Sequence, residues 1–273
     1  MSALVGAVPP PHLHVMTFNV RRPLPVTARP ADRWRRREPA LLRLLATERP
    51  SLLAAQEVLP LPARAIAAAL GPGYRRIGHG RQPGPRGEGT PLFYDSARLE
   101  LLEGAQWALS DHPDRPGSTG WGSPTPRVAV EAVLRDRATG AVFLTIGTHL
   151  DVFSVRARRL SAAAIGARVA ARALPTIVLG DMNAGPHSAP LSILTASGLG
   201  DAWLVAERHL TPEWGTLAGY RTPRAHGRRI DAVLVSGDIG VARIGIHGTP
   251  TDGVWPSDHL PVQAVLRLPG GRV

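Results

Sequence analysis

The stretch P-T-I-V-L-G-D-M-N-A-G-P, residues 175–186, joins a short apolar run to an acid and an amide. The run 176–179 predicts a buried strand, because it is brief, partly β-branched and bounded by Pro and Gly. Asp181 and Asn183 follow it two residues apart, so both side chains are expected on one side of the extended chain. There they could grip a water molecule or a metal-bound oxygen. Taken alone, the stretch is more typical of a strand that ends in an Asx-type turn than of a site.

The pattern around this stretch predicts one α/β domain at residues 13–268, after a leader (1–12) and before a tail (269–273). Helices are expected after the first, second, seventh and eighth strands, and so many strands favour two packed sheets over one open sheet. Residues 78–90 and 110–126 are expected to be loops, and residues 207–228 irregular. Strands are predicted at 13–20, 51–55, 74–77, 91–94, 99–107, 128–135, 141–150, 176–179, 229–236, 241–247 and 260–268, and helices at 34–49, 62–70, 155–173 and 190–196.

The composition restricts the classes of protein and of site. The formal net charge is +11, and every basic residue is Arg. Because these arginines are scattered, the charge favours anionic partners without proving nucleic-acid binding. The absence of Cys excludes disulfides and thiolate metal sites. No apolar run reaches the roughly 18 residues of a membrane span, and the N-terminus lacks a secretory signal, which favours the cytoplasm. Nothing in the sequence indicates an obligate protein partner.

Polar side chains that can bind a metal or a proton recur at the ends of the predicted strands. Each alone has an ordinary structural interpretation, such as a turn residue, a surface acid or a buried histidine. Their joint occurrence favours a site of hard oxygen donors, suited to Mg²⁺, Mn²⁺ or Ca²⁺. The residues are Asn19, Glu57, His149, Asp181, Asp231, Asp258 and His259.

These motifs, taken in order, resemble the endonuclease/exonuclease/phosphatase superfamily over residues 13–268. They are T-F-N-V, Q-E, T-H-L-D, G-D-M-N-A-G-P, R-I-D-A-V-L and S-D-H-L-P-V. The resemblance implies a four-layer α/β sandwich, with two packed mixed β-sheets flanked by helices and a site at one edge. It also implies a metal-dependent phosphoric ester hydrolase.

The resemblance implies a role for each matched residue. Asn19, Glu57 and Asp258 match the residues of a divalent-metal site, for which Mg²⁺ is expected and Mn²⁺ or Ca²⁺ are alternatives. Asp181 and Asn183 match the pair that orients the attacking water. His259 matches the histidine beside the scissile phosphate, and Asp231 matches the carboxylate that fixes the tautomer of that imidazole.

Three further matches are looser. His149 matches a second histidine that can protonate the leaving oxygen, and Glu88 matches its partner. Arg127 matches an arginine that contacts the phosphate. Arg21 is a departure, because some members of the family carry a metal-binding aspartate at that position. The sequence therefore offers one acid fewer, which counts against a two-metal mechanism.

The expected function is hydrolysis of phosphodiesters, with nucleic acid favoured as the substrate because of the positive charge. The alternative is a phosphatase or phosphodiesterase that acts on a small-molecule or lipid-headgroup phosphate. A catalytically silent binding module is a more remote alternative, since nearly every expected acid and histidine is present. The sequence shows neither a basic wedge helix that could open duplex DNA nor an apolar hairpin extension that could seat the chain on a membrane.

Overall fold

The computed structural model of the protein describes residues 2–270 and contains two six-stranded sheets. The first sheet has the order β13-β14-β1-β2-β6-β3. Its centre is mixed, because β1 runs parallel to β2 and antiparallel to β14. The strands are β1 (His12–Asn19), β2 (Leu52–Gln56), β3 (Tyr74–Ile77), β6 (Leu92–Asp95), β13 (Gly240–Ile246) and β14 (Val262–Arg267).

The second sheet has the order β11-β12-β10-β9-β8-β7 and holds the stretch 175–186 at its centre. Here β10 runs parallel to β9 and antiparallel to β12. The strands are β7 (Leu99–Ala108), β8 (Val128–Asp136), β9 (Val142–His149), β10 (Thr176–Asp181), β11 (Leu199–Asp201) and β12 (Asp231–Ser236).

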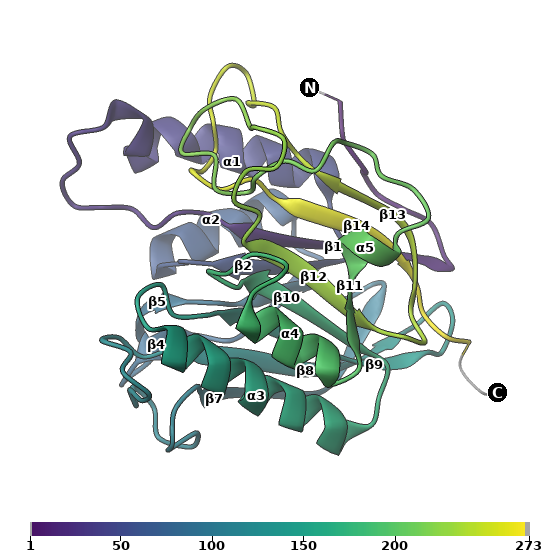
Figure 1. Ribbon diagram of the computed structural model, residues 1–273. Helices are drawn as coiled ribbons and strands as arrows, with labels where there is room; N and C mark the ends of the chain where they lie inside the picture. The colour runs from purple at the N-terminus through teal and green to yellow at the C-terminus, as the bar shows by residue number, and fades with distance from the viewer. Residues whose placement is uncertain (1, 271–273) are drawn as a thin grey trace.

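Helices cover the outer face of each sheet (Figure 1). The first sheet packs against α1 (Trp34–Glu48) and α2 (Pro60–Leu70). The second packs against α3 (Val155–Arg172) and α4 (Ala189–Ala196). Local signals set two of these helix starts: Ser154 caps α3 by accepting from the Ala157 N–H, and α4 begins with Pro190 in its first turn.

Alternation along the central strands builds three apolar layers. On β1, Val15 faces the layer between the sheets, while Met16 faces the layer under α1 and α2. On β10, Leu179 faces the layer between the sheets, while Val178 faces α3 and α4. The predicted four-layer α/β sandwich is therefore confirmed.

One local prediction was wrong, and three short elements were missed. Residues 78–90, expected to be a loop, contain a hairpin of β4 (Gly80–Gln82) and β5 (Arg86–Gly89). Its Gly- and Arg-rich strands carry almost no apolar alternation, so the strand pattern is absent from the sequence. The short β11 and α5 (Ala202–Val205) were missed for lack of length, as was the 3₁₀ turn Pro30–Asp32.

The predicted leader packs against the rest of the chain. Residues Leu4, Val5 and Gly6 donate their backbone N–H groups to the carboxylate of Glu48 on α1. Of the predicted tail, residues 271–273 lie outside the described residues. Within residues 2–270, no helix combines the length and the apolar character needed to cross a membrane.

Candidate active site

Three of the predicted site residues lie side by side at the ends of adjacent strands. In the register of the second sheet, Asp181 on β10 is paired with His149 on β9 and with Asp231 on β12. The Nε2 atom of His149 is 3.5 Å from Asp181 Oδ2. All three side chains are buried. Burying these three polar side chains at the end of an otherwise apolar sheet costs free energy unless each has a hydrogen-bond or ion-pair partner. Residues of the neighbouring loops are among those partners.

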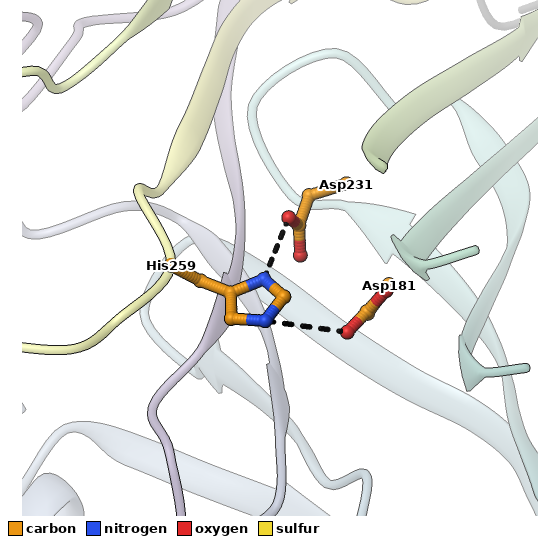
Figure 2. A group of neighbouring side chains, drawn as sticks. All are labelled: Asp181, Asp231 and His259. Carbon is orange, nitrogen blue, oxygen red and sulfur yellow. Dashed lines mark hydrogen bonds and ion pairs between the residues drawn. The ribbon is translucent and has the colours of Figure 1, made fainter. Parts of the chain in front are cut away.

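His259 enters this row from the segment before β14, in the first sheet. Its Nδ1 is 2.9 Å from Asp231 Oδ2, and its Nε2 lies 3.8 Å from Asp181 Oδ2 (Figure 2). Ser257 holds the segment in place, because its hydroxyl donates to the backbone oxygen of Asn19 at 2.7 Å and accepts from the His259 N–H. The imidazole therefore sits between two carboxylates that belong to the other sheet.

The two histidines have opposite pKa shifts. Burial alone would lower the pKa of His259, but the charges of Asp231 and Asp181 outweigh it and raise this pKa to about 10. The pKa of His149 is lowered well below its ordinary value by burial and by the nearby positive charges of Arg127 and Arg81. At neutral pH the site therefore holds one imidazolium and one neutral imidazole.

The pKa of Asp181 is raised, chiefly by burial and then by the charge of Asp231, against the opposing effect of His259. A carboxylate of this kind accepts a proton more readily than an exposed aspartate does. Its environment thus suits a general base.

Asn183 and Asp181 form a turn and also face the site. The Asn183 N–H donates to Asp181 Oδ1 at 2.9 Å, which is an Asx turn, and Asn183 has a positive φ of 48°. The Asn183 amide donates to the backbone oxygen of Leu150 at 3.0 Å. Both residues line the same cavity. The stretch therefore forms an Asx turn and at the same time contributes side chains to the site.

Asn19 joins this row to Glu57. Its Nδ2 donates to Glu57 Oε1 at 3.1 Å and to Asp181 Oδ2 at 3.0 Å. Glu57 follows β2 with a positive φ of 59° and accepts the Arg22 N–H through Oε2 at 3.0 Å. A non-glycine residue in this region is strained, and such strain gathers at functional sites.

A cavity of about 390 Å³ opens over these residues. Its polar lining combines acids and histidines with several arginines, which suits a phosphate flanked by a cation. Its apolar rim includes Phe153, a residue that is 73% exposed. The lining comprises Arg21, Arg22, Glu57, Arg81, Glu88, Thr125, Arg127, His149, Val152, Phe153, Asp181, Asn183, Leu217, Ile230, Asp258 and His259.

Arg127 is held for contact with an anion. Its Nε donates to Asp151 Oδ2 at 3.2 Å, and its Nη1 is buried without a hydrogen-bond partner. Asp151 is completely buried and also accepts from Ser123 and from the backbone N–H groups of Phe153 and Ser154. A buried donor without a partner is costly, so Nη1 calls for an acceptor such as a phosphoryl oxygen.

Glu88 lines the cavity, but its ion pairs are with Arg81 of the same hairpin and with Arg22 at 3.8 Å. No hydrogen bond or ion pair found among residues 2–270 joins it to His149. In this structure Glu88 therefore pairs with Arg81 and Arg22, two of the arginines that line the cavity.

Asn19, Glu57 and Asp258 fit a hard divalent cation. The pKa of Asp258 is raised by burial and by the charges of Glu57 and Asp32, against His259 and Arg21. Burial is the largest of these effects, so the charged form of Asp258 is costly without a cation beside it, and carboxylate and amide oxygens are donors that suit Mg²⁺. Asp181, Asp231 and His259 bring their ligand atoms within 4.8 Å of one another. In that group His259 Nδ1 is already paired with Asp231 Oδ2 at 2.9 Å, so a metal ion would have to displace this contact.

Sequence reasoning missed several residues that shape the site. Asp151 stands in the T-H-L-D motif, and its place beside a recognised histidine was an available signal. Asp32 binds both Arg21 and Tyr220, and Arg81 pairs with Glu88; these contacts connect segments with no pattern of their own. No local sequence signal could have paired them.

Comparison with known proteins agrees with this geometry. The sequence model of the endonuclease/exonuclease/phosphatase family matches residues 16–259. A search of curated proteins found no match.

Among solved structures, family proteins from Bacteroides thetaiotaomicron and Bacteroides vulgatus are similar, with TM-scores of 0.87 and identities of 26% and 29%. The alignments cover 96% and 94% of this chain and 99% of each of those chains. A mannosyl-6-phosphatase from Bacteroides thetaiotaomicron is similar at 26% identity and a TM-score of 0.86, over 93% of this chain and 99% of that one. Since the family model spans nearly the whole chain and the fold agrees with it, this protein belongs to the endonuclease/exonuclease/phosphatase family.

Proposed function

We propose that this chain hydrolyses phosphoesters with the help of a divalent cation, expected to be Mg²⁺. The observation that carries the proposal is the imidazole of His259 between Asp231 and Asp181, at a cavity that arginines line. An imidazolium and a guanidinium that face one space are suited to the oxygens of a phosphoryl group.

The residues divide the chemistry as follows. Asp181, with its raised pKa, accepts the proton of the attacking water, and Asn183 helps to orient that water. The Nε2–H of His259 and the free Nη1–H of Arg127 donate to phosphoryl oxygens, where negative charge grows as the new P–O bond forms and the ester bond breaks. Asp231 keeps His259 protonated and oriented.

Asn19, Glu57 and Asp258 would hold the cation, which when bound supplies Lewis-acid stabilisation of the phosphoryl charge. The lowered pKa of His149 argues against its role as the acid for the leaving oxygen, because a neutral imidazole holds no readily donated proton. We assign to His149 a hydrogen bond to the bound phosphoryl group. The leaving oxygen takes its proton from water in the open cavity.

The cavity best suits a small phosphate ester. Four arginines line a space of about 390 Å³. Arg21 is paired with Asp32, while Arg22, Arg81 and Arg127 offer positive charge, and a phosphomonoester carries more negative charge for them to bind than a diester does. The exposed Phe153 ring at the rim offers a face for the leaving group. The similarity to a structure named a mannosyl-6-phosphatase supports this substrate class. Phosphodiesters of nucleic acid are the second candidate, favoured by the net charge of +11.

A substrate panel tests the proposal. Mannose 6-phosphate, 4-nitrophenyl phosphate, bis-4-nitrophenyl phosphate, single-stranded RNA and plasmid are each incubated with Mg²⁺ and with EDTA, using wild-type protein and His259→Ala. We expect turnover of the monoesters in Mg²⁺, none in EDTA, and a loss of about 10²-fold or more in the variant. Cleavage of RNA or plasmid alone would establish the second candidate. Turnover that survives EDTA, or none on any ester, would refute the hydrolase proposal.

A further inference from the structure

We infer that Arg21 acts as a fixed cation among the acids of the cavity and limits them to one divalent ion. The inference rests on the proposed function, since it concerns the cation that Glu57 and Asp258 would hold. If the site binds one divalent cation and not two, a residue of the chain must supply the rest of the positive charge that the carboxylates need, and we assign that role to Arg21.

The guanidinium of Arg21 lies among three carboxylates. Its Nε is 3.1 Å from Asp32 Oδ1 and 3.7 Å from Asp258 Oδ2, and its Nη1 is 4.0 Å from Glu57 Oε2. Each of these carboxyl groups comes from a different part of the chain. Arg21 is therefore the charge that they share.

Asp32 holds the guanidinium in this position. The Asp32 side chain is only 6% exposed and accepts from Arg21 Nε, from Thr27 and, at 2.5 Å, from the hydroxyl of Tyr220. Burial would raise the pKa of Asp32, but the hydrogen bonds from Arg21 and Tyr220 lower it overall, so the carboxylate stays charged. The Arg21 side chain is 30% exposed, but its partner Asp32 is buried and held by further hydrogen bonds, so the pair resists displacement better than one between two exposed side chains.

The backbone around Arg21 is fixed as well. Arg21 has a left-handed φ of 54°, and its N–H donates to Asn19 Oδ1 at 3.0 Å. The fully buried Arg37 on α1 donates to the backbone oxygens of Val20, Arg21 and Pro256 at 2.9–3.0 Å. It thereby ties the end of β1 to the segment that carries Asp258, so the guanidinium and the acids keep their spacing.

Charge balance gives the consequence. The carboxylates of Asp32, Glu57 and Asp258 with one guanidinium leave two negative charges, which one divalent cation neutralises. A second divalent cation would leave two positive charges among these four groups. Asp32 is buried and the other three are partly buried, so this excess charge is costly. A neutral residue at position 21 removes one positive charge and frees carboxylate oxygens to bind another ion.

Mn²⁺ binding tests this without reference to turnover. The purified chain is titrated with Mn²⁺, and bound ions are counted from the loss of the free-ion signal in electron paramagnetic resonance, with folding checked by circular dichroism. Arg21→Gln removes the charge, and Arg21→Lys keeps it. Arg22→Gln is the matched control, because Arg22 lines the same cavity but pairs with Glu88.

We expect one Mn²⁺ per chain in the wild type, in Arg21→Lys and in Arg22→Gln, and two in Arg21→Gln. One ion in a folded Arg21→Gln protein would overturn the inference and leave the proposed function intact. Two ions in the wild type would overturn it even if Arg21→Gln failed to fold. No bound ion in the wild type would refute the metal site itself, and the inference with it.

Discussion

Asn19 connects the two sheets at the site, because its Nδ2 donates to Asp181 Oδ2 at 3.0 Å. Asn19 ends β1 in the first sheet, and Asp181 ends β10 in the second. The same nitrogen donates to Glu57. One amide therefore bridges the buried carboxylate of Asp181 and the partly buried one of Glu57, and fixes the sheets to each other where the chemistry is proposed.

Replacing this amide by a carboxylate should destabilise the fold. We expect Asn19→Asp to lose about 2–4 kcal/mol of unfolding free energy in EDTA, because two hydrogen bonds become contacts between like charges. Mn²⁺ should restore part of the loss. Urea unfolding with and without Mn²⁺ measures both, and Gln82→Glu, the same change at an exposed position, serves as the control. An unchanged stability in EDTA would contradict the role given to Asn19.

Asp231 supports His259, so its removal should impair turnover more than folding. We expect Asp231→Asn to lower kcat/KM by at least about 10²-fold, because an amide neither stabilises the imidazolium nor fixes its orientation as a carboxylate does. Steady-state kinetics on the ester found in the substrate panel checks this. Asp238→Asn, an exposed position in the turn after β12, should keep wild-type kinetics. Comparable activity in both variants would remove Asp231 from the mechanism.

His14 should make the fold sensitive to mild acid. Burial lowers the pKa of His14 to about 4 from an ordinary value of 6.5, despite its 2.8 Å hydrogen bond to Gln263. Between these values the unfolded chain binds a proton that the folded chain excludes, so stability falls as the pH drops. The His14 contribution to this loss is about 2 kcal/mol between pH 7 and pH 5.

Urea unfolding at both pH values, compared with His14→Phe, measures that contribution. We expect the variant to have a lower free energy of unfolding at pH 7, because Gln263 loses its hydrogen-bond partner. Its free energy of unfolding should also change less between pH 7 and pH 5 than that of the wild type. His112→Phe, the same change at an exposed position, is the control. An identical slope in His14→Phe and the wild type would show that His14 does not titrate in this way.

Glu48 anchors the N-terminal segment. It accepts the N–H groups of Leu4, Val5 and Gly6 at 2.7–3.1 Å. The interaction with His247 and these three bonds together outweigh burial and lower the pKa of Glu48 to about 2. We expect Glu48→Gln to cost about 2 kcal/mol and to speed amide hydrogen exchange at residues 4–6. Glu38→Gln on the same helix is the control. Unchanged exchange in Glu48→Gln would mean that other contacts hold the segment.

The sequence by itself determined the order and type of the main elements and the residues at the strand ends. The spacing of apolar residues and the Pro and Gly residues that end helices and strands are local signals. From them β1, β10 and the four main helices were predicted to within a few residues. The hairpin β4–β5 was missed because its strands lack the alternation that a buried face imposes. Asn19, Asp181 and His259 were found because the family motifs carry them.

Only the tertiary structure decided which of these side chains meet. Tyr220 reaches Asp32 across 188 positions of sequence, and Asp32 in turn holds Arg21 beside Glu57. Glu88, expected beside His149, pairs with arginines because the unpredicted hairpin places Arg81 next to it. Such contacts depend on how two sheets and their loops pack, and packing brings together segments whose local sequences carry no information about each other. The row His149–Asp181–Asp231 likewise exists only through strand register.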